Sequence, residues 1–357
     1  YVFTAGDGQD VIEDNGFNDT DRIVIHGYTP ANVILSTTAA GSNDLVIGFQ
    51  GSTDTITAMN TLDEDAYDRI EQIVFNDGTI WSSADVRANL YAQQTTDGGD
   101  VLWGFKPNDT LDGGLGDDTI SGRDGSDTYV FTAGDGQDVI EENGFNDTDR
   151  IVIHGYTPAN LILSTTAAGS NDLVISFQGS TDTITVMNTL DEDAYDKVEQ
   201  YVFDDGTIWS SADVRANLYT QQATTGDDQL WGYKPADTLE GGLGNDTLIG
   251  QDGSDTYVFT AGDGQDVIED NGFNDTDRIV IHGYTPANTN VSFLNGTADG
   301  LVITFAGSTD RITVINTLGG DAYDQVETIT FDDGTIWSIP ALVITDMIGT
   351  NGNDLLT

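Results

Sequence analysis

The sequence predicts an all-β protein in which segments of short stacked repeats alternate with β-rich spacer domains, each spacer with at most one short helix. Three observations lead to this fold class. A long repeat divides the chain into similar copies, and a nine-residue repeat lies within each copy. Between these blocks, apolar and polar residues alternate and glycine-rich turns separate the runs, which is the pattern of short strands.

The long repeat has a period of 128 residues. The segment Tyr-Val-Phe-Thr-Ala-Gly-Asp-Gly-Gln-Asp begins at Tyr1, Tyr129 and Tyr257 without any slip, and the third copy diverges more strongly after Asn288. Long, nearly identical copies are common in adhesive and structural proteins, where each unit contacts only its neighbours. They favour a structural array over an enzyme.

The nine-residue repeat fills residues 95–141 and 223–269. Each unit has aspartate in its sixth position and an apolar or aromatic residue in its eighth. The sixth-position aspartates are Asp100, Asp109, Asp118, Asp127 and Asp138 in the first block, and Asp228, Asp237, Asp246, Asp255 and Asp266 in the second. The chain also begins in such a unit, with Asp10, and ends in another, with Asp354, so we expect it to be part of a longer protein.

Each position of the repeat has a direct physical role. Glycine permits the positive φ angles that a sharp six-residue loop needs. In the three-residue strand that follows, the central side chain points inward, because side chains alternate along a strand. Successive turns then stack these residues into a thin core, which in the first block consists of Leu102, Leu111, Ile120, Tyr129 and Ile140.

Two of the units, GGLGDDTIS at 113–121 and GGLGNDTLI at 241–249, match the nonapeptide G-G-x-G-x-D-x-U-x in full. The chain therefore resembles the RTX, or haemolysin-type calcium-binding, repeat proteins. This resemblance implies that the repeat blocks form a parallel β-roll, the RTX β-solenoid, which binds Ca²⁺. The other units match in part; Pro107, for example, replaces the fourth-position glycine of its loop.

The resemblance also implies where calcium lies. Ca²⁺ takes about six to eight oxygen ligands from carboxylates and carbonyls. Loops on one edge of the roll belong to alternate turns, so each ion is expected between loop n and loop n+2, as between Asp118 and Asp138, or between Asp127 and Asp109 upstream. The predicted metal-ligating residues are Asp10, Asp100, Gly114, Gly116, Asp118, Asp127, Gly134, Gly136, Asp138, Asp228, Gly242, Gly244, Asp246, Asp255, Gly262, Gly264, Asp266 and Asp354. The alternative is that the Asp-Gly pairs serve only as turn residues.

The chain is expected to divide into seven segments. The predicted RTX rolls are the end of one roll at 1–13, complete blocks at 95–141 and 223–269, and the start of another at 349–357; the predicted β-rich spacers are 14–94, 142–222 and 270–348. The spacers resemble the domain described as haemolysin-type calcium-binding-related, on the segments 43–47, 51–60 and 70–81.

Each spacer is predicted to contain short strands and one short helix. In the first copy the expected strands lie near 21–25, 33–35, 45–47, 55–57 and 70–75. Ser82 and Ser83 can cap a helix that runs to about Gln93, with Asp85 in its first turn, and Pro340 is expected to alter this helix in the third copy.

An Asp-x-apolar pattern recurs within the spacer, at Asp21, Asp54 and Asp68. Two interpretations are open. Either the spacer continues the roll with longer coils, or aspartate simply precedes strands in turns.

The charge of the chain excludes several classes of partner. Asp and Glu number 61 against 11 Lys and Arg, so the formal net charge is -50. Nucleic acid and anionic membrane surfaces would be repelled, and no apolar run approaches the roughly 18 residues of a membrane span. We therefore expect neither nucleic-acid binding nor membrane insertion.

Bound calcium is expected to neutralise this charge. A compact state that carries it repels itself, and bound divalent cations would neutralise it. The chain has no cysteine, so metal is also the expected staple in place of the disulfides usual in secreted proteins.

No catalytic motif is evident in the sequence. The GxSxG, HExxH and GxxxxGK[ST] patterns are missing. His26, His154 and His282 share one repeat position at a strand end and are interpreted as turn residues. Tryptophans such as Trp81 and Trp103 could stack on sugars, although such residues more often pack within the fold.

We therefore expect a non-enzymatic, calcium-binding structural array of a secreted or cell-surface protein, of matrix, surface-layer or adhesin-like kind. Calcium ions are the expected partners, with other copies of the chain or surface glycans as further candidates. The resemblance implies type I secretion to the extracellular space without a cleaved signal peptide. Two alternatives remain open: the non-catalytic RTX region of a secreted hydrolase, epimerase or toxin, and a carbohydrate-binding module.

Overall fold

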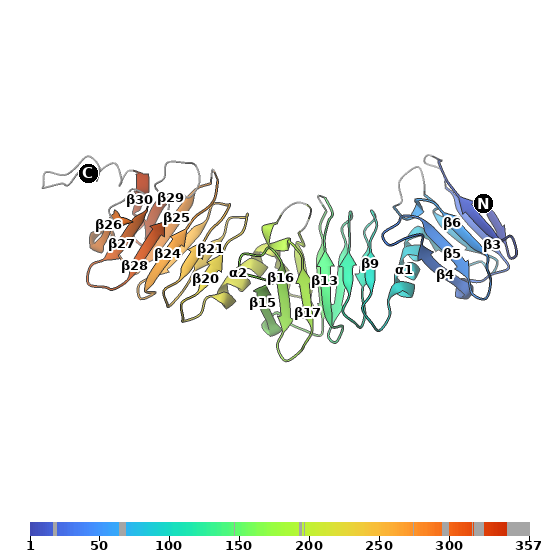
Figure 1. The fold of residues 1–357 in the computed structure, drawn as a ribbon, viewed down its shortest axis with the longest axis horizontal. Coiled ribbons are helices and arrows are strands. Elements are labelled where there is room, and N and C mark those ends of the chain that lie inside the picture. Colours follow the sequence, from blue (N-terminus) through green and yellow to red (C-terminus); the bar gives the residue numbers. More distant parts are fainter. Residues whose placement is uncertain are drawn as a thin grey trace. The chain divides into compact units, whose positions relative to one another are not determined.

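The structure is a computed structural model that describes residues 1–16, 20–63, 69–145, 147–192, 195, 197–273, 275–294, 300–315, 317 and 325–340. Within these residues the chain is strand-rich, with two α-helices (Figure 1), so the predicted all-β fold class is confirmed. The chain forms two compact units. The first comprises Tyr1–Ile162, Asp172–Thr189 and Asp193–Ser211, and the second comprises Leu163–Asn171, Leu190–Glu192 and Ala212–Thr357.

The first spacer contains the strands that the sequence predicts, each within a few residues. Its strands, with the two that precede it, are β1 (Val2–Thr4), β2 (Gln9–Ile12), β3 (Arg22–His26), β4 (Val33–Thr37), β5 (Leu45–Phe49), β6 (Thr55–Ala58), β7 (Gln72–Phe75) and β8 (Ile80–Ser82). They form two sheets, with the orders β1-β3-β7-β8 and β2-β6-β5-β4. The sequence does not predict β8, which pairs antiparallel with β7.

The nine-residue repeats form two parallel sheets. One sheet contains β9 (Val101–Trp103), β11 (Thr119–Ser121) and β13 (Gln137–Glu141), and the other contains β10 (Thr110–Asp112) and β12 (Thr128–Thr132). The register stacks equivalent positions, so Ile120 lies between Leu102 and Ile140, and Tyr129 lies beside Leu111. All five of these predicted core side chains are at most 2% exposed.

The spacer that follows continues the roll. β14 (Arg150–His154) pairs parallel with β12, and β17 (Thr183–Val186) pairs parallel with β13. β18 (Gln200–Phe203) then pairs parallel with β14. Of the two interpretations of the Asp-x-apolar pattern, the first is therefore confirmed: the spacer is a further, longer coil of the same roll.

Antiparallel strands end each parallel stack. β16 (Leu173–Phe177) pairs antiparallel with β17, and β19 (Ile208–Ser210) pairs antiparallel with β18. β15 (Leu161–Thr165) precedes β16 in the chain, and α2 (Ser211–Gln222) follows β19. The reversal of strand direction ends the regular succession of coils.

The second unit repeats this plan. Its strands are β20 (Gln229–Trp231), β21 (Thr238–Glu240), β22 (Thr247–Ile249), β23 (Thr256–Thr260), β24 (Gln265–Glu269), β25 (Asp277–His282), β26 (Thr289–Phe293), β27 (Leu301–Phe305), β28 (Arg311–Ile315), β29 (Val326–Phe331) and β30 (Ile336–Ser338). The sheet orders are β20-β22-β24-β28-β27-β26 and β21-β23-β25-β29-β30. Similar sequence copies thus produce the same topology twice.

The helix α1 (Ser83–Gln94) has the cap that the sequence predicts. The Ser82 hydroxyl accepts the Asp85 N–H at 3.2 Å, and the Asp85 carboxylate accepts the Ser82 N–H at 2.8 Å. The helix packs against β4, β8, β9 and β10. Its buried residues are Val86, Arg87, Leu90 and Tyr91. In the third copy, the predicted alteration of the helix falls beyond Pro340 and lies outside the described residues. Neither described helix has the length and apolar character of a membrane span.

Candidate metal centres

The loops of the roll lie at two edges. Loops 95–100, 113–118 and 133–138 run into the adjacent parallel strands β9, β11 and β13, and we call their edge the first edge. Loops 104–109 and 122–127, with the described residues 142–145 and 147–149, run into β10, β12 and β14 and form the second edge. In the second unit the first edge consists of 223–228, 241–246 and 261–266, and the second edge of 232–237, 250–255 and 270–277. Each edge therefore brings together loops of alternate turns.

At the first edge, the sixth-position aspartates form a ladder from turn to turn. The Asp100 N–H donates to Asp118 at 2.7 Å, and the Asp118 N–H donates to Asp138 at 3.0 Å. The second unit has the same ladder, with Asp228 donating to Asp246 at 2.8 Å and Asp246 donating to Asp266 at 3.0 Å. Each of these bonds uses Oδ1, while the Oδ2 atoms of Asp118 and Asp246 are buried without a hydrogen-bond partner. Those atoms are available to a cation.

Glycines let the loops of the first edge approach one another. Gly116 and Gly136 have φ angles of 135° and 120°, and a Cβ on Gly136 would overlap the carbonyl oxygen of Gly116. The Gly116 N–H donates to the carbonyl of Asp135 at 2.6 Å. Positive φ angles also occur at the other predicted glycines, Gly114, Gly134, Gly242, Gly244, Gly262 and Gly264. The loops predicted to share an ion thus lie in contact. Calcium binding between them stays a prediction.

Burial opposes ionisation at the first edge. Asp118 is 1% exposed and Asp138 is 4% exposed. Burial, reinforced by the charges of Asp118 and Asp135, raises the pKa of Asp138 to about 7, and burial also raises the pKa of Asp118. In the second unit burial raises the pKa of Asp266 to about 7. A divalent cation would favour the charged forms and remove this cost.

Not every acid beside these loops needs a cation. Asp54 accepts the hydroxyl of Tyr28 at 2.6 Å and the N–H of Gly6 at 2.7 Å. These hydrogen bonds lower the pKa of Asp54. Asp182 and Asp310 have the same two kinds of donor in the later copies. They hold the loop in place through hydrogen bonds alone.

The second edge carries a longer ladder of acids. The Asp109 N–H donates to Asp127 at 2.7 Å, the Asp127 N–H donates to Asp149 at 2.7 Å, and the Asp149 N–H donates to Glu199 at 2.7 Å. The second unit repeats it from Asp237 to Asp255 (2.8 Å), Asp277 (2.6 Å) and Glu327 (2.7 Å). The ladder thus runs out of the nine-residue repeats and into the spacer.

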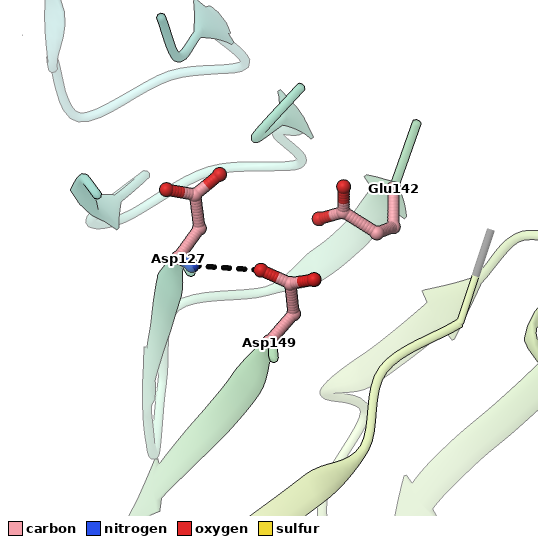
Figure 2. Close-up of side chains that lie close together, drawn as sticks. All are labelled: Asp127, Glu142 and Asp149. Atoms are coloured by element: carbon pink, nitrogen blue, oxygen red, sulfur yellow. Dashed lines mark hydrogen bonds between the residues drawn. The ribbon is translucent and has the colours of Figure 1, made fainter. Parts of the chain in front are cut away.

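Three carboxylates meet in this ladder where roll and spacer join. Asp127, Glu142 and Asp149 each offer an oxygen within 4.8 Å of the others, and Figure 2 shows the side chains pointing toward one another. They are 0%, 3% and 0% exposed. Oδ2 of Asp127 and Oδ2 of Asp149 are buried without a hydrogen-bond partner. Burial raises the pKa of Asp127 to about 9, of Asp149 to about 8 and of Glu142 to about 7.

The second unit has the same cluster with one change. Asp255, Asp270 and Asp277 lie within the same distance of one another, so aspartate replaces the glutamate. Burial raises the pKa of Asp255 to about 8, of Asp270 to about 6 and of Asp277 to about 9. Both copies of the repeat therefore bury three acids in one place.

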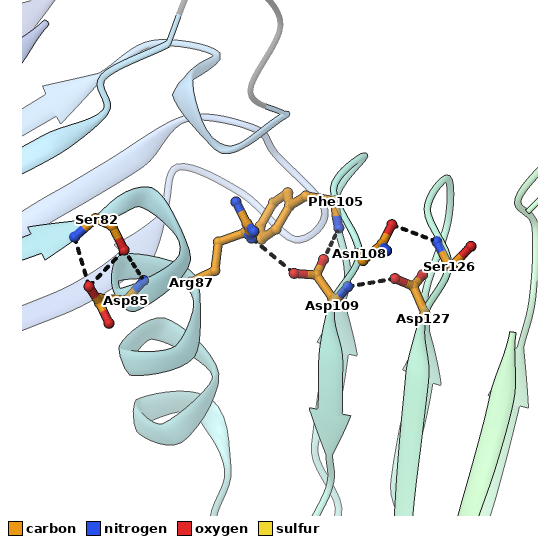
Figure 3. Close-up of polar contacts among 8 residues, drawn as sticks. All are labelled: Ser82, Asp85, Arg87, Phe105, Asn108, Asp109, Ser126 and Asp127. Atoms are coloured by element: carbon orange, nitrogen blue, oxygen red, sulfur yellow. Dashed lines mark hydrogen bonds and ion pairs between the residues drawn. The ribbon is translucent and has the colours of Figure 1, made fainter. Parts of the chain in front are cut away.

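At the upstream end of the second edge, an arginine supplies the positive charge. Arg87 of α1 donates from Nε to Asp109 at 2.9 Å, and the other oxygen of Asp109 accepts the Phe105 N–H at 2.8 Å (Figure 3). Arg87 and Asp109 are 6% and 5% exposed. In the second unit Arg215 pairs with Asp237 at 3.1 Å. The predicted neighbours Asp109 and Asp127 do lie together, but a guanidinium already neutralises the upstream carboxylate.

Sequence reasoning missed four acids of the two clusters: Glu142, Asp149, Asp270 and Asp277. The reason is that the loop 142–149 has eight residues instead of six and lies outside the nonapeptide register. The signal that could have found them is the Asp-x-apolar pattern at Asp149-Arg150-Ile151, which equals that of the roll.

The remaining predicted residues have other outcomes. Asp10 is exposed in β2, opposite Ile56 of β6. Asp354 and the predicted roll at 349–357 lie outside the described residues. Trp81 packs edge-to-face on Phe75, with ring centres 5.0 Å apart, and Trp103 lies beneath Arg123. These contacts support packing roles for both tryptophans.

The donor atoms suit calcium. Each cluster and each first-edge loop presents carboxylate oxygens, and the neighbouring loop carbonyls add more of the same kind. Hard oxygen ligands in flexible arrangements are those that Ca²⁺ prefers, whereas thiolate sites for softer metals are excluded by the lack of cysteine. The buried carboxylate oxygens without partners are the observation that shows the fit.

Two known protein families match the chain. The haemolysin-type calcium binding protein related domain matches residues 44–85, 172–213 and 301–339. The RTX calcium-binding nonapeptide repeat matches residues 94–129, 103–140 and 236–265. The matches fall on the spacers and on the rolls respectively, so both resemblances found in the sequence are confirmed.

Individual proteins match only in part. The chain is 30% identical, over 121 residues, to the iron-regulated protein FrpA of Neisseria meningitidis serogroup C; the match covers 33% of this chain and 11% of that protein. The crystal structure of the extracellular lipase LipA from Serratia marcescens matches with 20% identity and a TM-score of 0.17, covering 62% of this chain and 37% of the lipase chain. This chain therefore spans a small part of each protein.

Proposed function

The chain is an RTX calcium-binding repeat protein with haemolysin-type calcium-binding-related domains, and we propose that it acts as a calcium-stiffened structural array of a secreted or cell-surface protein. We propose that the whole protein is of matrix, surface-layer or adhesin-like type. In this role the ions are part of the fold, and the chain itself catalyses no reaction.

One observation carries the proposal: consecutive turns bury carboxylate oxygens that have no hydrogen-bond partner, as at Asp118, Asp127 and Asp149. Two like charges about 4 Å apart cost on the order of 4 kcal/mol at an effective dielectric near 20. A few such pairs rival the roughly 5–15 kcal/mol that stabilises a whole domain. An ion between two turns removes the repulsion and joins the turns, so it stabilises the folded roll by mass action.

The same acids support a non-catalytic role. Beyond the first aspartate of each ladder, one oxygen of each ladder aspartate accepts a backbone N–H of the adjacent turn, as in the bond from the Asp100 N–H to Asp118. Such carboxylates are fixed structural groups, and where the second oxygen has no partner, as at Asp118, it could bind a cation. The duplication of the whole pattern across two units fits an array better than a single reaction centre.

The location follows from the same linkage. Calcium is abundant outside cells and scarce in cytoplasm, so the rolls would stay loose before export and fold after it. Type I secretion without a cleaved signal would suit a chain of this kind.

A second function is favoured by the relatives. Because this chain covers only 11% of the FrpA protein, it also fits the non-catalytic RTX region of a larger secreted hydrolase, epimerase or toxin. The flanking sequence would distinguish the two, since the second function requires a catalytic or toxin domain in the same polypeptide.

Circular dichroism of the chain, first with chelator and then with calcium, tests the proposed function. We expect the β-signal to be weak in chelator and to rise cooperatively with calcium. Sodium chloride at the same ionic strength is the control, because it screens charge without occupying sites. A full β-signal in chelator, or recovery of the signal by sodium chloride alone, would show that calcium is incidental to the fold.

A further inference from the structure

We propose that the junction of roll and spacer holds a calcium site distinct from those of the nonapeptide loops, formed in the first unit by Asp127, Glu142 and Asp149 and in the second by Asp255, Asp270 and Asp277. The inference rests on the proposed function only for the identity of the ion. Two of the three ligands in each site lie beyond the matched nonapeptides, which end at residues 140 and 265.

The site has one wall from the roll and one from the spacer. Asp127 ends the roll loop 122–127, whereas Glu142 and Asp149 begin and end the spacer loop 142–149. Hydrogen bonds from backbone to side chain hold the two loops in register, because the Gly125 N–H donates to the Asp147 carboxylate at 3.0 Å and the Thr148 N–H donates to the Ser126 hydroxyl at 3.0 Å. An ion among the three carboxylates would therefore fasten the roll to its spacer.

Two of the three ligands, Asp127 and Asp149, each have one carboxylate oxygen without a hydrogen-bond partner. Oδ1 of Asp127 accepts the Asp109 N–H, and Oδ1 of Asp149 accepts the Asp127 N–H, both at 2.7 Å. Their Oδ2 atoms have no hydrogen-bond partner although both residues are 0% exposed. A buried carboxylate without a partner is costly enough that it is normally paired or bound to metal. The two Oδ2 atoms thus point to a bound cation.

The third ligand is fixed by its own loop. Glu142 accepts the N–H groups of Asn143 and Gly144 at 2.8 and 2.7 Å, and it also accepts the hydroxyl of Tyr129. In the second unit the Tyr257 hydroxyl donates to Asp270 at 2.8 Å. The equivalent tyrosine hydroxyl therefore donates to the carboxylate in both units, although Asp270 has a shorter side chain than Glu142.

The arginines nearest in sequence are engaged elsewhere. Arg123 donates to the carbonyl of Gly41 at 2.8 Å, and Arg150 donates from Nε to Thr128 at 2.9 Å. This differs from the upstream end of the same edge, where Arg87 neutralises Asp109. The downstream acids therefore need a cation from solution.

An ion has room to enter. A pocket of about 110 Å³ adjoins the site and is lined by Glu141, Glu142, Asn143, Met187 and Asn188. A Cβ on Gly122 would overlap the Tyr129 hydroxyl and Oδ2 of Asp127, so glycine at this position leaves room for both groups. Gly250 has the same relation to Tyr257 and Asp255. The carboxylates thus lie buried beside a pocket that reaches Glu142, and glycine leaves the room that they occupy.

The test removes one charge from each site in the complete chain, as Glu142→Gln with Asp270→Asn. The matched control is Asp205→Asn with Asp333→Asn, which removes the same charge from exposed turns at the other end of the strands. Calcium stoichiometry is measured by isothermal titration on protein stripped with chelator. We expect the site variant to bind two fewer ions per chain than wild type, one for each cluster, and the control to bind as many as wild type. Unchanged stoichiometry in the site variant would overturn the proposal.

A second variant covers the case in which the first does not fold. Tyr129→Phe with Tyr257→Phe keeps every carboxylate and removes the aromatic hydroxyls that touch the ligands. With terbium(III) in place of calcium, we expect this variant to keep the wild-type stoichiometry but to lose the part of the tyrosine-sensitised emission that comes from the junction ions. Emission equal to wild type would place the ion elsewhere. If wild type binds no calcium at all, the proposed function fails as well, whereas loss of the junction ions alone leaves it standing.

Discussion

The sixth-position aspartate has two oxygens with different tasks. At Asp118, Oδ1 accepts the N–H of Asp100, and Oδ2 is buried without a hydrogen-bond partner. The first task needs only an acceptor, which asparagine also offers, whereas the second needs a negative charge. This division explains why calcium and the backbone ladder can use the same residue.

Asp118→Asn with Asp246→Asn is expected to change stability in opposite directions in the two conditions. In chelator the variant should be more stable than wild type, because a buried charge is gone. In calcium it should be less stable, by roughly 1–3 kcal/mol per site, the cost of an unsatisfied buried group. Urea unfolding in both conditions measures this. The control is Asp117→Asn, since the second copy already has Asn245 at that position. A change of the same sign in both conditions would contradict the division of tasks.

Arg87 is expected to stabilise its unit without any metal. Arg87→Met leaves Asp109 buried and unpaired, so we expect a loss of about 3–5 kcal/mol in chelator and a smaller loss in calcium, which can replace the guanidinium. Arg69→Met is the control, because Arg69 is 40% exposed in its pair with Glu71 and such pairs contribute about 0–1 kcal/mol. Equal costs for the two variants in urea unfolding would refute a role for Arg87 as a built-in cation.

The stability of the calcium-free protein should fall as the pH rises. Burial raises the pKa of Asp127 to about 9, of Asp149 to about 8 and of Asp138 to about 7, above the value near 4 in an unfolded chain. The folded state therefore binds more protons, so the stabilisation is present below about pH 4 and is lost through about pH 7–9. Urea midpoints across this range, in metal-free buffer, measure the effect. Stability that rises with pH in the absence of calcium would contradict it.

Among the elements, short strands and the capped helix could be predicted from the sequence. The apolar eighth position fixes the inward face at Ile120 and Tyr129, and Ser82 with Asp85 marks the start of α1. The sequence could not predict which strands pair across the spacer. β13 pairs with β17 although β15 and β16 lie between them in the chain, and the nine-residue repeat does not extend over this separation. The proximity of Glu142 to Asp127 could not be predicted either, because the eight-residue loop 142–149 replaces a six-residue loop and breaks the nonapeptide register.

Gly136 and Gly134 lie in one loop and allow two effects of glycine to be distinguished, a positive φ angle and close approach to another loop. Both have positive φ, at 120° and 104°, but a Cβ would meet the backbone of Gly116 only at Gly136 and would meet nothing within 4 Å at Gly134. Gly136→Ala should therefore lower stability and calcium affinity more than Gly134→Ala, whose cost is the backbone strain common to both. Thermal unfolding and calcium titration of the two variants compare them. If Gly134→Ala costs as much, close approach of the loops is unimportant.

For the whole molecule, the net charge of -50 is the dominant constraint. Each compact unit contains a roll with acids at both edges, so each has its own demand for cations. In the three-residue strands of the roll, such as β9 and β10, apolar stacking gives a core of one side chain per strand, which is too thin to offset the repulsion. We therefore expect the fold of each unit to require bound ions.

The central claim is that calcium lies between the turns of the roll, and a crystal structure of the complete chain grown in millimolar calcium tests it most directly. Anomalous diffraction would locate each ion. The account predicts ions between loops 113–118 and 133–138, between loops 241–246 and 261–266, and within the Asp127 and Asp255 clusters. Well-ordered loops at these places with no anomalous peak would contradict it.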